Sequence, residues 1–262
     1  MTAERWTRTV RQQVGLGRLL PLGGPRDGAW IFERAAGAVL RHAVERADPG
    51  LRLDGLRIAL AAPEDAVEPV VPAPPSALPP GALRVTARFA APAAEPLPVT
   101  ADRLRAVLSR AAAERIGLVV TEVDLEVTEL LDAGPGTAHP AAESGPPGSA
   151  VDGSADAPFE GRDDAPFEVP RSGGGSDEDR AAAAAFAVPG VSRLTGTLGR
   201  PVHLASSPRV PGGAALSSRH VRVDLAVGAD HRALDVARSV RAAVSAALPD
   251  RPTVAVLVTA VD

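Results

Sequence analysis

The chain carries one unit of sequence twice, and this duplication restricts its fold more than any other feature. Residues 123–130 and 254–261 both follow the pattern V-x-h-x-V-T-x-h, in which h is an apolar residue. Upstream, the alternating segment 83–89 matches 221–227 in the same register. Further upstream, residues 47–51 match 187–191. Three matching blocks in the same order predict a duplicated domain.

Each copy is predicted to fold in the order α-β-β-α-β, from helical and alternating apolar periodicities. The expected helices cover about 29–46, 100–116, 177–188 and 231–247, and the expected strands cover 56–60, 83–89, 119–130, 202–204, 220–227 and 253–261. Asp27 and Asp230 are expected to cap the first and last of these helices. The predicted fold class is α+β, with two tandem units, each a small three-stranded sheet with helices packed on one face.

The predicted organisation has four parts. Residues 1–27 form a basic amphipathic segment, 28–132 the first repeat, 133–176 an acidic linker and 177–262 the second repeat. Between residues 133 and 178 nine acidic side chains stand against two arginines, in a Gly-, Pro- and Ser-rich context typical of disorder. Within it, Asp-Ala-Pro-Phe-Glu occurs at 156–160 and again at 164–168. This repeat is either slippage in a free linker or a bivalent docking peptide.

Composition excludes several classes of protein. There is no cysteine, and therefore no disulfide and no thiolate metal site. The net charge is -4, which supplies no basic field for nucleic acid. No apolar run approaches the roughly 20 residues that span a bilayer, and Arg5, Arg8 and Arg11 interrupt any signal peptide. We therefore expect a cytoplasmic protein, with a weak membrane-peripheral contact as an open alternative.

No residue set indicates a reaction. A nucleophile elbow G-x-S-x-G is missing, and Gly15-x-Gly17 lacks the third glycine of a phosphate-binding loop. His220 and Asp224 are expected on a solvated sheet face, close in sequence to Asp230 and His231, and a metal there would need a further ligand from elsewhere. We predict no catalytic residue, no cofactor and no metal.

The two copies differ on the outer face of their last strand. In the first copy Glu122, Asp124 and Glu126 share this face, and the neighbouring strand offers Arg84 and Arg88, which predicts a surface ion-pair ladder. In the second copy the matching positions are Thr253, Ala255, Leu257 and Thr259. Apolar residues on the outer face of a sheet are usually covered by another part of the protein or by a partner. We expect that cover to be the other repeat, another subunit or the N-terminal segment.

The N-terminal segment carries an apolar stripe of Trp6, Val10 and Val14 with arginines around it. The stripe either packs on the protein's own domains or docks weakly on an anionic membrane or a partner. The candidate interaction residues are Trp6, Val10, Val14, Ala255 and Leu257.

The second copy, through Val188-Pro189-Gly190-Val191 and the V-x-V-x-V of 254–258, resembles the alkaline-shock, envelope-stress-response family of Gram-positive bacteria. The first copy departs from this pattern with Asp48 at a position where the family favours an apolar residue. The resemblance implies a non-enzymatic, self-associating protein near the cell envelope. Residues 6–30 are similar to actinobacterial proteins that share the name of a baculoviral fibrous-body family, nucleopolyhedrovirus P-ten, although the coiled-coil heptads of such a viral protein are missing.

Two hypotheses of function follow. The first is an assembly or scaffold protein that acts by self-association or by binding another protein. The alternative is a small-molecule-binding or enzymatic protein that uses a cleft between the repeats. A nucleic-acid binder would need a G-x-x-G loop or stacking aromatics on its sheet, and the sequence offers neither.

Overall fold

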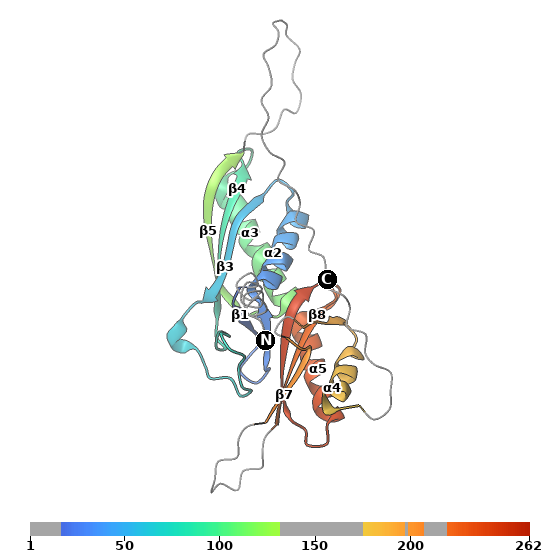
Figure 1. Ribbon diagram of the computed structural model, residues 1–262. Coiled ribbons are helices and arrows are strands. Elements are labelled where there is room, and N and C mark those ends of the chain that lie inside the picture. Colours follow the sequence, from blue (N-terminus) through green and yellow to red (C-terminus); the bar gives the residue numbers. More distant parts are fainter. Residues whose placement is uncertain (1–16, 132–174, 197–198, 207–218) are drawn as a thin grey trace, which may run out of the picture.

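A computed structural model describes residues 17–131, 175–196, 199–206 and 219–262 (Figure 1). The first repeat contains, in chain order, α2 (Glu33–Ala47), β3 (Arg52–Leu60), the short η1 (Pro63–Asp65), β4 (Leu83–Pro92), α3 (Leu97–Ala111), the short η2 (Ala112–Ile116) and β5 (Val120–Leu131). The second contains α4 (Asp177–Phe186), β6 (Val191–Leu194), β7 (Val202–Ser206), β8 (Arg219–Val227), α5 (Ala233–Ala247) and β9 (Thr253–Val261). Two further strands, β1 (Leu19–Leu22) and β2 (Ala29–Phe32), precede both repeats. The α+β class is confirmed.

The two repeats share one strand topology. In the first, β3 pairs antiparallel with β4, and β4 pairs parallel with β5. In the second, β6 and β7 pair antiparallel with β8, and β8 pairs parallel with β9. The register of β5 skips Thr128 and that of β9 skips Thr259. The shared V-T motif therefore marks one β-bulge at the same place in both copies.

The N-terminal strands join the second repeat and not the first. β1 and β2 form an antiparallel hairpin, and β2 pairs parallel with β9 through Ala29↔Val256, Trp30↔Leu257 and Ile31↔Val258. The second sheet therefore has six strands, in the order β1-β2-β9-β8-β6 with β7 also on β8, and not the three predicted, because the N-terminal hairpin and β6 add to it.

The helix expected from residue 29 is therefore wrong over its first four residues. Ala29–Phe32 form a strand in which every residue is buried, which suits a short apolar run enclosed on both faces of a sheet. The helix begins at Glu33 behind an N-cap, Phe32, that makes no side-chain bond. Asp27 consequently caps no helix and lies in the hairpin turn, where it accepts a bond from the Gly24 amide at 2.7 Å.

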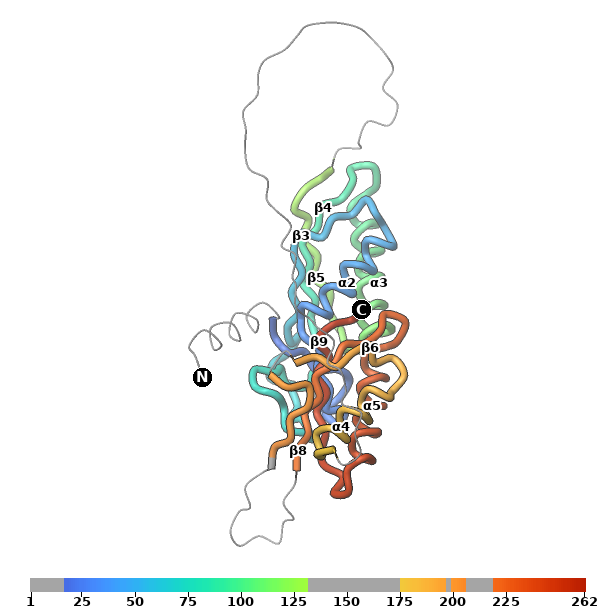
Figure 2. The backbone as a smooth tube through the Cα atoms, turned by 45° about the vertical axis from the view of Figure 1, so that its right-hand side comes forward, coloured from blue at the N-terminus to red at the C-terminus, as the bar shows by residue number. Residues whose placement is uncertain are grey.

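The helices of both repeats lie on the same side of the two sheets (Figure 2). Inward-facing residues of β4 meet apolar residues of α2 and α3, and all of them are buried: Leu83, Val85, Ala87, Phe89, Leu40, Val44, Leu104 and Leu108. β8 and β9 contribute Val221, Val223, Leu225, Val254, Val256 and Val258, which pack with Ala181, Ala185, Leu234, Ala237, Val240 and Val244 of α4 and α5. With so few aromatics, aliphatic side chains dominate both cores.

The repeats meet end to end at the turn after η2. Gly117 has a φ of 98°, and a Cβ there would lie 2.4 Å from Cβ of Leu234 in α5, so only glycine fits this close approach. The Gly117 carbonyl accepts a bond from the Gly23 amide at 3.1 Å. Arg232 donates to the carbonyl of Ala113 at 2.9 Å across the same junction.

The Pro-rich connection between β3 and β4 lies along the N-terminal hairpin. The Leu78 amide donates to the Leu19 carbonyl at 2.8 Å, and the Val70 amide donates to the Pro25 carbonyl at 2.9 Å. Val71 is buried beside Gly28. A loop without apolar periodicity thereby covers the outer edge of β1.

Candidate interaction surfaces

The predicted interaction residues of the second repeat are buried inside its sheet. Ala255 and Leu257 are fully enclosed. In register, Trp30 of β2 lies on one side of Leu257 and Asp224 of β8 lies on the other. The strand that pairs along this edge, β2, lies in the range 28–132 predicted for the first repeat and outside the predicted N-terminal segment 1–27. The other three candidates, Trp6, Val10 and Val14, lie outside the described residues.

Asp224 is not on a solvated face, because the outer face of the second sheet is buried at Asp224, Ala255 and Leu257. Its side chain is 0% exposed, and Oδ1 accepts a bond from Nε of Arg222 at 3.2 Å. Asp230 does not cap α5 either, since the N-cap is Arg232 and makes no side-chain bond. His220 lies within 3.0 Å of the Thr253 hydroxyl, and burial, with Arg222 and His203 nearby, lowers the pKa of His220.

Among the described residues, no three histidine or carboxylate side chains gather where a metal could bind. The carboxylates on the outer face of the first repeat are instead exposed and paired with guanidinium groups.

The first repeat has an open outer face that carries the predicted ion-pair ladder, which is confirmed. Nε of Arg84 lies 2.5 Å from Glu122 and 3.5 Å from Asp124, and Nε of Arg88 lies 3.4 Å from Glu126. The hydrogen bond and charge of Glu122 raise the pKa of Arg84. The three acidic side chains remain 45%, 60% and 64% exposed, so solvent screens each pair and its contribution to stability is small.

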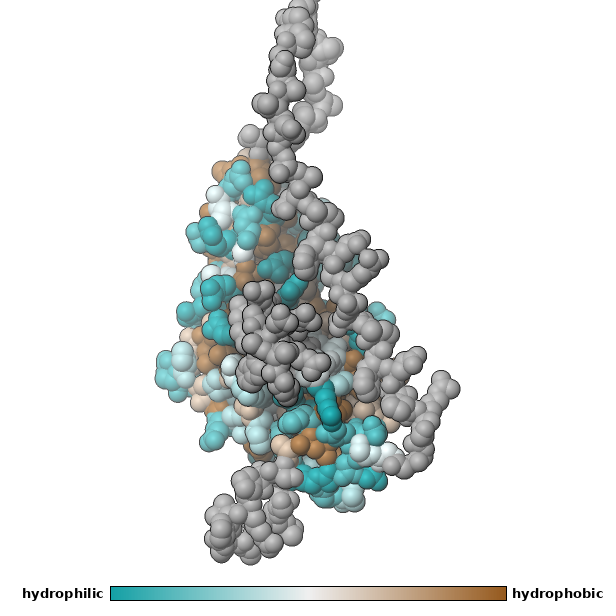
Figure 3. All heavy atoms as spheres, viewed as in Figure 1, coloured by the Kyte–Doolittle hydropathy of each residue, from teal (hydrophilic) through white to brown (hydrophobic). Residues whose placement is uncertain are grey.

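Equivalent positions in the two repeats thus have opposite environments. The shared bulge aligns Asp124 with Ala255 and Glu126 with Leu257. The acidic pair faces solvent, whereas the apolar pair is enclosed. Figure 3 shows hydrophilic residues over much of the visible first repeat, with hydrophobic atoms at the end where β5 terminates.

The edge of β5 is the second difference between the repeats. Among the described strands β5 pairs only with β4, and it forms an outer edge of its sheet (Figure 1). The corresponding edge of β9 is occupied, because the Val256 amide donates to the Gly28 carbonyl at 3.0 Å and β2 continues the pairing. Apolar side chains also remain exposed along β5, with Val127 at 40% and Leu130 at 53%.

A groove of about 690 Å³ runs between α2 and α3 on the helical side of the first repeat. Val39, Ala43 and Val107 lie in it, and its arginines are Arg46, Arg103, Arg110 and Arg115. Arg103 is neutralised by Asp48 at 2.6 Å and Glu95 at 2.7 Å. Arg46 and Arg110 make no ion pair with any described residue. Apolar side chains and an excess of arginines over its one acid, Glu114, therefore line the groove.

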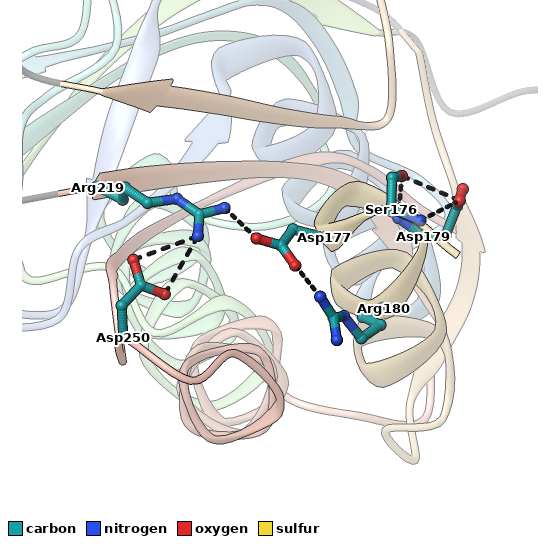
Figure 4. Close-up of polar contacts among 6 residues, drawn as sticks. All are labelled: Ser176, Asp177, Asp179, Arg180, Arg219 and Asp250. Carbon is teal, nitrogen blue, oxygen red and sulfur yellow. Dashed lines mark hydrogen bonds and ion pairs between the residues drawn. The ribbon is translucent and has the colours of Figure 1, made fainter. Parts of the chain in front are cut away.

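A polar cluster fixes the start of α4, where the chain re-enters the described structure (Figure 4). Ser176 and Asp179 form a capping box, each side chain bonding the other's backbone amide. Asp177 accepts a bond from Arg219 of β8 at 2.6 Å and another from Arg180, and these bonds lower the pKa of Asp177. Arg219 also pairs with Asp250 at 3.4 Å. The cluster joins α4 to the sheet and has a structural role.

Comparison with known proteins returned no match to any protein-family model, curated protein or solved structure. Of the helices in the described ranges, none is long and apolar enough to cross a membrane.

Proposed function

We propose that the chain is a non-enzymatic assembly or scaffold protein of the envelope-stress-response type, which acts by binding another protein or a second copy of itself. The observation that supports this function is the contrast between the repeats. The second repeat uses its sheet face and the β9 edge internally, whereas the first leaves the matching face and edge open.

In this proposal the first repeat binds the partner and the second repeat supports it. An exposed strand edge offers a row of backbone donors and acceptors that another chain can pair with. A charged sheet face beside it adds specificity, because a partner must match its pattern of acids and arginines. The second repeat, joined to the first through the Gly117–Leu234 contact, holds that surface on a larger folded body.

Site-specific photocrosslinking tests the proposal. A photoreactive residue at Thr86, which is exposed on the outer face of the first sheet, should give discrete crosslinked species in cells that naturally express the chain. The matched control is the same residue at Ala246, which is exposed on α5 of the second repeat. Crosslinks at Thr86 and none at Ala246 would support the proposal. No crosslink at Thr86 would contradict it.

Peripheral membrane contact through the basic segment belongs to the same proposal. Its support is the sequence alone, in the stripe of Trp6, Val10 and Val14. Co-sedimentation with anionic vesicles should rise with anionic lipid, fall with salt and disappear in Trp6→Ala. Vesicle binding that does not depend on the content of anionic lipid would contradict this contact.

The groove between α2 and α3 favours a second candidate function, the binding of an anionic ligand with an apolar body. Arg46 and Arg110 carry positive charge that pairs with no acid in the described part of the chain, and Val39 and Val107 offer apolar surface in the same groove. This site lies within the first repeat and not between the repeats. Octanoate should shift the NMR signals of the Val39 and Val107 methyl groups, and Arg110→Glu should abolish the shift. Unchanged methyl signals would remove this candidate.

A further inference from the structure

We infer that the open edge of β5 binds an extended segment of another protein, which runs parallel to β5 and alternates basic with apolar side chains. This inference rests on the proposed function and specifies the chemistry of its partner.

The second repeat already pairs with a parallel strand at the corresponding edge. In the second repeat, β2 pairs parallel with β9 along the edge that corresponds to the free edge of β5. β2 comes from a chain segment outside the repeat and more than 200 residues away in sequence. The α-β-β-α-β unit can therefore accept a parallel strand at this edge while its core stays intact.

The matched bulges identify the backbone groups that a new strand would use. Val256 directs its N–H outward to Gly28. Leu125 occupies the equivalent position, two residues before Val127, as Val256 lies two residues before Val258. Because backbone groups alternate in direction along a strand, Val123, Leu125 and Val127 direct their N–H and C=O groups to the open edge.

The side chains along β5 define the partner. On the outer face, Glu122, Asp124 and Glu126 form an acidic row, with the arginines of β4 behind it. A neighbouring strand that places Lys or Arg beside this row would enclose each acid between two cations. On the helical face, Val123 and Leu125 are half-buried and Val127 is exposed, so this face of the partner should be apolar.

The acidic row also argues against a second copy at this edge. Two β5 strands related by a twofold axis would align antiparallel, which brings the two rows of Glu122, Asp124 and Glu126 together. Like charges on adjacent strands are destabilising. The edge therefore favours a different chain with the opposite charge.

The test uses the full-length protein and a synthetic seven-residue peptide that alternates Lys with Ile and Val. Backbone NMR should show slowed hydrogen exchange at Leu125 and Val127 when the peptide is added. A peptide with Glu in place of each Lys should bind about tenfold more weakly or worse, since three opposite-charge pairs become repulsive. A nitroxide on the N-terminus of the Lys peptide should broaden signals near Val120 and not those near Leu131, because the pairing is parallel.

Two variants locate the binding. Val127→Pro removes an edge-facing N–H without touching the ladder to β4, so its spectrum should stay folded while peptide binding falls at least tenfold. Glu126→Lys should weaken binding several-fold, whereas Glu114→Lys, at an exposed position on η2, should leave it unchanged.

The inference would be overturned if hydrogen exchange at Leu125 did not change, or if the Glu peptide bound as tightly as the Lys peptide. It would also be overturned if the nitroxide broadened the signals near Leu131 and not those near Val120. If the Lys peptide did not slow hydrogen exchange along β5 but Thr86 still gave crosslinks, the assembly function would remain supported. Only the proposed strand partner would be refuted. Dimerisation through β5 would refute the inference in favour of a second copy.

Discussion

Replacing one residue at a matched position in each repeat should have very different costs. Leu257 is fully buried between Trp30 and Asp224, so Leu257→Ala removes apolar contacts and leaves a cavity. Such substitutions typically destabilise a protein by about 2–5 kcal/mol. Its counterpart Glu126 is 64% exposed and pairs with Arg88 at 3.4 Å, so Glu126→Ala should cost at most about 1 kcal/mol.

Urea unfolding measures both changes. Fluorescence in a Trp6→Phe background reports on Trp30, which lies beside Leu257 in the sheet. A loss of about 3 kcal/mol corresponds to a fall in Tm of roughly 6–12 °C for a chain of this size. If Leu257→Ala cost less than about 1 kcal/mol, or if Glu126→Ala cost as much as Leu257→Ala, the opposite environments of the two sheets would be refuted.

Three further predictions follow from the N-terminal hairpin and the junction. Burial raises the pKa of Asp27, but the bonds from Arg238 and Gly24 outweigh it and hold this pKa below its usual range. The contribution of Asp27 to stability is therefore present above the unfolded pKa and lost as pH falls through the folded one. Asp27→Asn should therefore reduce stability at pH 6 and flatten its decline between pH 5 and pH 2 in urea titrations; an unchanged profile would contradict this. Gly117→Ala should lower the Tm by several degrees because its Cβ would lie 2.4 Å from Cβ of Leu234, whereas Gly24→Ala, whose Cβ would lie 3.9 Å from an Asp27 oxygen, should not; equal Tm values would contradict the close junction. Deleting residues 1–26 removes β1 and should destabilise the second repeat in calorimetry, whereas deleting 1–16 leaves both strands; equal stability of the two truncations would count against β1 as part of the sheet.

The repeated units and the charge ladder could be predicted from local patterns. Alternation of apolar residues placed β4, β5, β8 and β9, because side chains alternate faces along a strand. The same alternation put Arg84 and Glu122 on one face of adjacent strands, and the ion pair followed from that placement. Both inferences depend on residues that are neighbours in one repeat.

The hairpin and its partner could not be predicted in the same way. Ala29–Phe32 reads equally well as the first turn of a helix, and its partner β9 lies at the other end of the chain. Two signals were nevertheless available in the sequence. Residues 23–28 are rich in glycine between two short apolar runs, which is typical of a hairpin. The apolar Ala255 and Leu257 indicated a covered strand, and the burial of Asp224 follows from that enclosure.

The central claim is that one edge position of the repeated unit is filled in the second copy and open in the first. Native-state amide hydrogen exchange at Leu125 and Val256, measured by NMR in the full-length protein alone, tests it most directly. The account predicts that the Val256 amide, bonded to Gly28, exchanges orders of magnitude more slowly than the Leu125 amide. Equal protection at the two amides would contradict it.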